Sequence, residues 1–274
     1  MSATFDELLD RSNLTGRQFL IYAGQQLHPG LVLYNSVYSI GWPGLDTKRF
    51  QAAWQALVDS CDALRTVINE VDGIPQQKVL PTAPAEVECL DLRPDGEPAR
   101  QWIERRLQQP IELTRRIYDT AMLRVGEDEY VWFLHIHHII VDGAAVQILI
   151  RRVTELYWGA IDKDTVFPQF AEHAANACAQ RHSAEYRAAR DYWLNALQQV
   201  PSTPHFYGVD AFKNTAQERV ILTLDRADST ALTTLARSLV TSTVSEHAVI
   251  ANLLTRCSRL TLEESAARSR LRLE

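Results

Sequence analysis

Two adjacent histidines, His137 and His138, stand at the end of an apolar run that is typical of a buried β-strand. The run covers residues 130–138 and is rich in aromatic and β-branched side chains. An Asp-Gly pair follows at 142–143, and a helical pattern then covers 144–158. Because imidazole titrates near neutral pH, a histidine at such a strand end is able to accept or release a proton in a closed site.

Strand alternation separates the two histidines. Side chains at alternate positions point to opposite faces of a sheet, so His138 shares a face with Trp132 and Leu134, whereas His137 shares a face with His135. We expect His138, at the strand end, to be the reactive imidazole. We expect His137 to be held inside by hydrogen bonds that fix the local backbone.

Of two other interpretations of these histidines, one remains open. Together, His135, His137 and His138 are compatible with a set of hydrogen-bonded histidines in the core. A zinc site would need further ligands, but Ile139 and Ile140 stand where a His-x-His-x-Asp-His motif has its aspartate and third histidine. The sequence therefore predicts no metal ion.

Asp142 and Gly143 each allow a structural and a functional interpretation. Asp142 precedes the helical pattern and is suited to cap its first turn. Its carboxylate is also suited to pair with an arginine that keeps the histidine segment in shape, and the two roles are compatible. Gly143 either eases the turn or leaves room for a substrate to approach the backbone. Both pairs of interpretations stay open at this point.

Composition narrows the class of protein. The chain has 274 residues, 46 % of them hydrophobic, which suffices for one large or two smaller domains. Its net charge of −6 argues against nucleic acid as a partner. The four cysteines form no CxxC pair, and no apolar stretch is long enough to span a membrane. The first residues lack the pattern of a signal peptide, so we expect a cytoplasmic protein.

The remaining pattern predicts mixed α and β structure, that is, an α+β fold in which helices pack on one side of a sheet. A hairpin is expected around Asp72-Gly73, and Asp46 or Thr47 is expected to cap the helix over 47–64. Gly159 is expected to end the helix over 144–158. Further strands are predicted over 31–40 and 219–225, and further helices over 98–108, 186–197, 228–239 and 244–259.

Several segments match motifs of one acyltransferase family. Residues 137–143 match a His-His-x-x-x-Asp-Gly signature, and 60–66 resemble an Arg-His-Glu-x-Leu-Arg-Thr segment, best from Leu64 to Thr66. The other matching segments follow in the family's order; they are 14–18, which match loosely, Pro110-Ile111-Glu112-Leu113, Phe167-Pro168-Gln169-Phe170-Ala171 and Asp191-Tyr192-Trp193. Together these segments resemble the condensation domains of nonribosomal peptide synthetases, which are chloramphenicol acetyltransferase-like acyltransferases. The resemblance covers about residues 14–260.

This resemblance implies a function. Condensation domains join an acyl or peptidyl thioester donor to an aminoacyl acceptor, and both substrates arrive on the 4′-phosphopantetheine arms of carrier proteins. Under this interpretation His138 positions the amine and handles its proton, with His137, Asp142 and Gly143 completing the motif. The resemblance also implies that Asp142 is paired with an arginine, for which Arg65 is the candidate. No cofactor other than the carried phosphopantetheine is implied.

The chain departs from the family in ways that affect this interpretation. Ala144-Ala145 replace the usual Trp-Ser, and Cys61 replaces a histidine and is expected to be a small buried residue. We interpret 1–175 as the N-terminal lobe and 176–274 as part of a second lobe that is incomplete. The expected partners are carrier proteins, with the remaining lobe or neighbouring synthetase domains. Two alternatives are a non-catalytic module that docks carriers and an ester-forming acyltransferase.

Overall fold

The computed structural model describes residues 5–93, 97–198, 223–239 and 250. The chain divides into two compact units, residues 1–197 and residues 198–274. The lobe boundary predicted after residue 175 lies inside helix α6 (Phe170–Gln180), whereas the division into units falls after residue 197. The assignment of the two units to two lobes stays a prediction.

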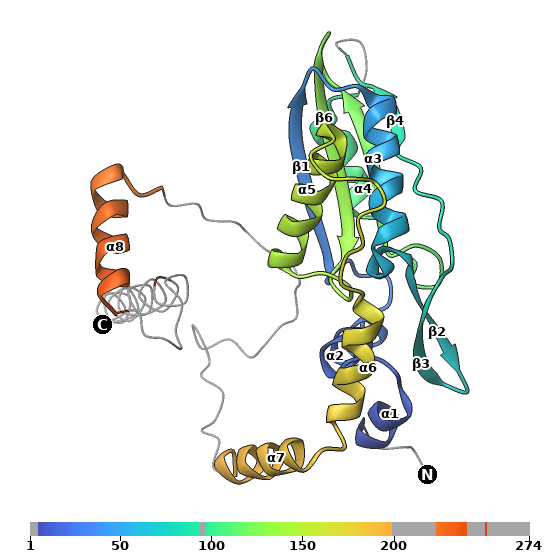
Figure 1. Ribbon diagram of the computed structural model, residues 1–274, viewed down its shortest axis with the longest axis vertical. Helices are drawn as coiled ribbons and strands as arrows, with labels where there is room; N and C mark the ends of the chain where they lie inside the picture. The colour runs from blue at the N-terminus through green and yellow to red at the C-terminus, as the bar shows by residue number, and fades with distance from the viewer. Residues whose placement is uncertain (1–4, 94–96, 199–222, 240–249, 251–274) are drawn as a thin grey trace, which may run out of the picture. The chain divides into compact units, whose positions relative to one another are not determined.

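A four-stranded mixed sheet forms the centre of the first unit (Figure 1). Its order is β1-β6-β5-β4, in which β6 pairs antiparallel with both β1 and β5, and β4 pairs parallel with β5. The mixed sheet agrees with the predicted fold class. The strands are β1 (Asn35–Pro43), β4 (Glu88–Asp91), β5 (Tyr118–Arg124) and β6 (Glu129–His137).

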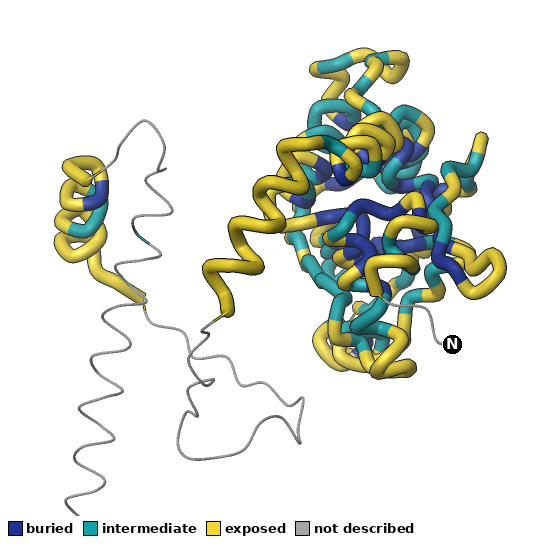
Figure 2. The backbone as a smooth tube through the Cα atoms, turned by 90° about the horizontal axis from the view of Figure 1, so that it is seen from below, coloured by how far each residue is buried: buried dark blue, intermediate teal, exposed yellow. Residues whose placement is uncertain are grey.

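Helices cover both faces of this sheet, which corrects the expectation of helices on one side. Trp132 and Leu134 face the larger core, which they share with helices α3 (Thr47–Ser60) and α5 (Gly143–Trp158). Phe133 faces the other side, where its ring lies 5.1 Å from that of Trp102 in helix α4 (Ala99–Leu107). The alternation predicted for the strand is therefore confirmed. Figure 2 shows buried and exposed residues along the backbone.

A separate hairpin, β2 (Thr66–Val71) and β3 (Ile74–Val79), confirms the predicted turn. Asp72 and Gly73 both have positive φ, 52° and 72°, as the tight two-residue turn of a hairpin requires. Two helix ends that the sequence predicts are also confirmed. The Asp46 carboxylate accepts hydrogen bonds from two backbone amides at the start of α3, and Gly159 ends α5 in the left-handed conformation at φ 70°.

The remaining described elements are α1 (Phe5–Arg11), α2 (Gly16–Leu27), the short 3-10 helix η1 (Asp62–Arg65), α7 (Ala184–Ala196) and α8 (Arg226–Leu239). The predicted helices over 98–108, 186–197 and 228–239 are confirmed by α4, α7 and α8. The predicted strand over 219–225 and helix over 244–259 lie almost entirely outside the described residues, and 223–225 are not in a strand. Among the helices described here, none is long and apolar enough to cross a membrane.

Candidate functional site

The chain leaves the sheet between the two histidines. Strand β6 ends at His137, and a turn begins at His138, one residue earlier than the sequence predicts. The backbone amide of His138 donates a hydrogen bond of 2.7 Å to the carbonyl oxygen of Tyr34, which precedes β1. Strand β1 and the turn are therefore tied together, and the side chain of His138 is exposed.

The imidazole of His138 has a defined tautomer. Its Nδ1 lies 2.5 Å from the carbonyl oxygen of Val141. Since a carbonyl oxygen only accepts, Nδ1 carries the hydrogen in the neutral ring, and the lone pair lies on Nε2. No hydrogen bond from another described residue reaches Nε2. The turn thus presents a nitrogen that is able to accept a proton from a bound molecule.

His137 has the opposite environment. Its side chain is 1 % exposed, and its Nδ1 accepts a hydrogen bond of 3.1 Å from the amide of Ile139. Burial, with a smaller effect of His138 and His135, lowers the pKa of His137 to about 4. The ring is therefore uncharged at neutral pH and fixes the backbone of the turn. Its Nε2 has no hydrogen-bond partner among the described residues.

His135 lies away from the turn, on the α4 face of the sheet. It is 1 % exposed, stands opposite Asp119 of β5, and its Nε2 also lacks a partner in the described part of the chain. Burial lowers its pKa, and the nearby Asp119 carboxylate partly opposes this effect. The three histidines therefore do not meet in one site. Within the described ranges, no cluster of three or more His, Cys, Asp or Glu is arranged to hold a metal ion.

Asp142 caps helix α5. Its carboxylate accepts a hydrogen bond of 2.8 Å from the amide of Ala145, and its carbonyl accepts one of 3.0 Å from Val146. The N-cap interpretation is thus confirmed. The carboxylate fixes the point where the helix begins, and so it fixes the turn that carries His138.

The predicted ion pair between Arg65 and Asp142 is not formed, and this expectation is wrong for the described chain. The guanidinium of Arg65 instead donates to the carbonyl oxygens of Val58, Leu80 and Pro81 at 3.1, 2.5 and 3.2 Å. It therefore joins the end of α3 to the segment after β3. Arg65 stabilises the scaffold and does not act on the histidine turn.

Gly143 is the first residue of α5 and is exposed. Its φ is not positive, and no atom of the described residues lies within 4 Å of the place where a Cβ would stand. Neither backbone strain nor packing within the chain requires glycine here. Close approach of a bound molecule therefore stays as the functional prediction for this position.

Tyr34 and Gly24 are part of the site, although the sequence analysis did not identify them. Besides binding the amide of His138, Tyr34 places its ring 6.3 Å from that of His137. Gly24 lies in the middle of α2, and a Cβ there would stand 2.1 Å from the Tyr34 hydroxyl oxygen. A glycine inside a helical segment is the signal that would have indicated this close contact.

Two of the sequence motifs meet away from the histidines. The buried carboxylate of Asp62 accepts hydrogen bonds of 2.7 Å from the amides of Phe170 and Ala171 at the start of α6. The segment 60–66 and the segment 167–171 are thus joined by one side chain. This contact anchors α6 to the end of α3 through a helix cap supplied from more than 100 residues away in the sequence.

Comparison with known proteins gives one consistent result. The family described as Condensation domain matches residues 10–258. Isonitrile lipopeptide synthase of Streptomyces coeruleorubidus is 28 % identical over 244 residues, which cover 85 % of this chain and 16 % of that protein. Tyrocidine synthase 3 of Brevibacillus parabrevis is 33 % identical over 186 residues, which cover 67 % of this chain and 3 % of that protein.

A solved structure is similar as well. The starter condensation domain of rhizomide synthetase superposes with a TM-score of 0.63 at 26 % identity. The match covers 69 % of this chain and 48 % of that one. The chain therefore spans about half the length of the solved domain and a smaller part of each synthase.

Proposed function

Because the chain belongs to the condensation-domain family, we propose that it supplies the histidine-bearing part of such a domain in nonribosomal peptide synthesis. The reaction joins a carrier-bound acyl or peptidyl thioester to a carrier-bound aminoacyl acceptor. The observation that supports this proposal is the exposed His138 ring, whose Nδ1 is held by Val141 and whose Nε2 is left as an acceptor. The partners are carrier proteins that present both substrates on phosphopantetheine.

The chemistry requires one proton acceptor. The acceptor's amine attacks the thioester carbonyl, a C–N bond forms, and the C–S bond breaks as the phosphopantetheine thiolate leaves. The amine must lose one proton, and the thiolate takes up one. Nε2 of His138 is suited to hold the amine by a hydrogen bond and to accept this proton, because the bond to Val141 fixes the tautomer.

The buried neighbour, His137, supports the assignment of the proton acceptor to His138. His137 stays uncharged because burial lowers its pKa to about 4, so no second positive charge opposes proton uptake at His138. His137 is a positioning residue in this proposal. It orients the backbone of the turn through the amide of Ile139.

The experiment supplies donor and acceptor carriers loaded with their substrates and follows amide formation by mass spectrometry. The chain is assayed alone and with a fragment that carries the remaining half of a condensation domain. We expect turnover with the added half and its loss in His138→Ala. His173→Ala, which removes an exposed histidine of α6, is the matched control. Equal product from the His138→Ala variant would rule out the proposed role of His138.

A second candidate function is a non-catalytic module that docks carriers. Carrier binding without turnover, even after the other half is added, would support this alternative. An ester-forming acyltransferase is compatible with the same histidine turn, and assays with hydroxyl and amine acceptors in parallel separate the two reactions.

A further inference from the structure

A second feature lies apart from the His138 turn. A groove of about 550 Å³ opens between the end of α4, the loop that leads to β5, and the segment after β3. Its polar lining includes four arginines, Arg65, Arg106, Arg115 and Arg116. No residue from 137 to 143 lines it, so it is distinct from the candidate site described above.

The lining of this groove is rich in positively charged side chains, although the net charge of the chain is negative. Only two carboxylates, Glu112 and Asp119, stand against the four arginines of the lining, whereas the whole chain has a net charge of −6. Clefts lined by one sign of charge attract ligands of the opposite sign. The groove therefore favours an anion.

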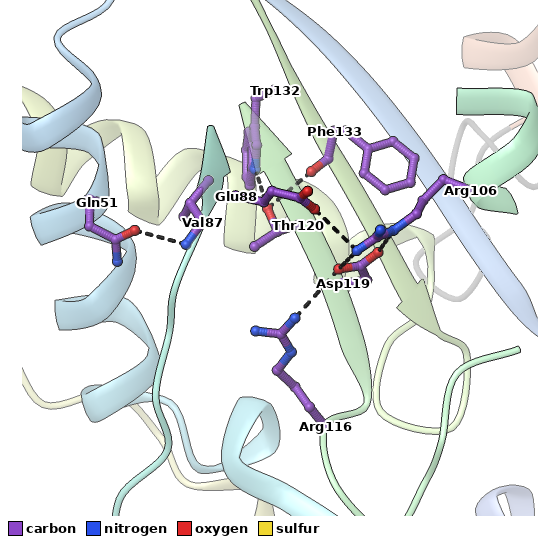
Figure 3. Close-up of polar contacts among 9 residues, drawn as sticks. All are labelled: Gln51, Val87, Glu88, Arg106, Arg116, Asp119, Thr120, Trp132 and Phe133. Carbon is purple, nitrogen blue, oxygen red and sulfur yellow. Dashed lines mark hydrogen bonds and ion pairs between the residues drawn. The ribbon is translucent and has the colours of Figure 1, made fainter. Parts of the chain in front are cut away.

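The arginines differ in how far their charge is already neutralised, and Figure 3 shows two of them, Arg106 and Arg116, with their carboxylate partners. Arg106 is saturated, because it binds Asp119 at 2.5 Å and Glu88 at 3.3 Å. Arg116 binds the same Asp119 carboxylate at 3.4 Å, so its ion pair is longer and weaker than that of Arg106. In this way one carboxylate serves two guanidinium groups, and Arg116 keeps donors for a ligand.

Arg65 and Arg115 are the least neutralised of the four. Arg65 donates to backbone carbonyls and has no carboxylate partner among the described residues. Within the described part of the chain, the one carboxylate partner of Arg115 is Glu112, at 3.9 Å, and both side chains are largely exposed. Guanidinium groups bind carboxylate and phosphate oxygens in a bidentate manner, so these residues are suited to hold an oxyanion.

An independent observation points to a ligand at the same place. His135 lines the groove, is 1 % exposed, and has a buried Nε2 without a hydrogen-bond partner among the described residues. Leaving a buried polar atom unpaired is unfavourable, and such atoms are rare in folded proteins. An oxygen of a bound molecule would supply the missing partner.

We propose that this groove binds a small ligand with a phosphate or carboxylate group, held by Arg65, Arg115 and Arg116, with His135 at the inner end. The proposal does not depend on the proposed condensation activity. It assigns a binding role to the segment 109–116, which contains the Pro110-Ile111-Glu112-Leu113 motif. Nothing in the His138 turn requires the arginines that follow this motif.

The test is a titration of the whole chain at constant ionic strength with three probes: inorganic phosphate, glycerol 3-phosphate and succinate. Binding is followed by calorimetry and by the NMR signals of the His135 ring. We expect saturable binding of at least one probe with a shift of the His135 signals. A response to both phosphates alone identifies a phosphate site, and a response to succinate alone identifies a carboxylate site.

Two variants make the test specific. Arg115→Gln combined with Arg116→Gln is expected to weaken binding about tenfold or more, since two charge-assisted contacts are lost. Arg100→Gln with Arg151→Gln removes the same charge from exposed positions outside the groove lining and is expected to leave affinity unchanged. Absence of saturable binding, an equal loss in both double variants, or an unchanged His135 signal on saturation would each overturn the proposal.

Discussion

The hydroxyl oxygen of Tyr34 lies 2.1 Å from the point where a Cβ on Gly24 would stand. Glycine inside a helix lowers helix stability by about 0.5–1 kcal/mol relative to alanine. Helix α2 is therefore less stable than it would be with alanine at position 24, but it has room for the Tyr34 side chain. The same tyrosine accepts the hydrogen bond from the His138 amide. Helix α2 is therefore linked to the histidine turn through one residue, Tyr34, whose side chain meets Gly24 and whose backbone carbonyl binds the His138 amide.

Gly24→Ala is expected to destabilise the chain and to disturb His138, because the added methyl overlaps Tyr34. We expect a loss of about 1–3 kcal/mol in the free energy of unfolding by urea, together with a shift of the His138 ring signals in NMR spectra. Adding Tyr34→Phe removes the closest atom, so the double variant should lose less than the sum of the single losses. Gly16→Ala in the same helix meets no atom within 4 Å and is the control. If the losses of the two single variants simply added in the double variant, the proposed contact between position 24 and Tyr34 would be contradicted.

Asp62→Ala is expected to detach the start of α6. The carboxylate accepts two amide hydrogen bonds of 2.7 Å, and its removal leaves both donors without a partner. We expect a loss of about 2–4 kcal/mol in the free energy of unfolding and faster hydrogen exchange at Phe170 and Ala171. Asp59→Ala, at an exposed position of α3, should change stability by less than about 0.5 kcal/mol. Unchanged exchange at both amides would contradict this role for Asp62.

The pH dependence of stability should report on His137. Its pKa is about 4 in the folded chain against 6.5 for an unperturbed histidine, so between these values the unfolded chain binds more protons. Stability from this group is therefore full above pH 6.5 and is lost as the pH falls toward 4, by about 3 kcal/mol in total.

Urea unfolding at several pH values from 4 to 7 measures this effect. In His137→Asn, which retains an acceptor for the Ile139 amide, the curve should lose the part of its slope that comes from the histidine. His28→Asn, at an exposed histidine beyond α2, should keep the slope of the unaltered chain. An identical slope in the His137 variant would place the titrating group elsewhere.

Local signals were sufficient to predict several elements from the sequence. The Asp72-Gly73 turn, the Asp46 cap and the Gly159 helix end each depend on one or two residues whose backbone preferences are strong. The family resemblance drawn from the ordered motifs is confirmed by the match over residues 10–258. His138 is exposed because β6 ends at His137, whereas alternation alone would place it on the face of Trp132 and Leu134, which packs into the larger core.

Tertiary contacts explain what the sequence did not reveal. Strand β5 is buried on both faces and shows no alternation, and β4 has only four residues. Helix α6 is rich in alanine, buries only Ala174, and is capped by Asp62 from a distant segment. The partners of Arg65 depend in the same way on which carbonyls the fold brings close, and the pairing with Asp142 that the family resemblance implied is not formed.

A double-mutant cycle tests the corrected role of Arg65. Asp142→Ala should cost about 0.5–2 kcal/mol through the lost cap of α5, and Arg65→Ala should cost stability through its three lost hydrogen bonds. The two losses should add within about 0.5 kcal/mol, because the side chains share no contact. The matched cycle on Arg106 and Asp119, which are 2.5 Å apart, should show clear coupling. Coupling of similar size in the Arg65–Asp142 cycle would show that these two side chains do form an ion pair.

Gly143 offers the sharpest separation of function from stability. No atom in the described ranges lies within 4 Å of a Cβ at this position and its φ is not positive, so Gly143→Ala should keep or slightly raise stability, by up to about 1 kcal/mol. A substrate that approaches the start of α5 would nevertheless meet the added methyl. We therefore expect lower turnover in Gly143→Ala, and less still in Gly143→Val, in the carrier assay with the added half domain. Gly41→Ala, also in open space but in β1, is the control and should retain turnover. Full turnover in Gly143→Val would show that no substrate needs to approach the backbone at this position. Glycine would then only ease the turn that leads into α5.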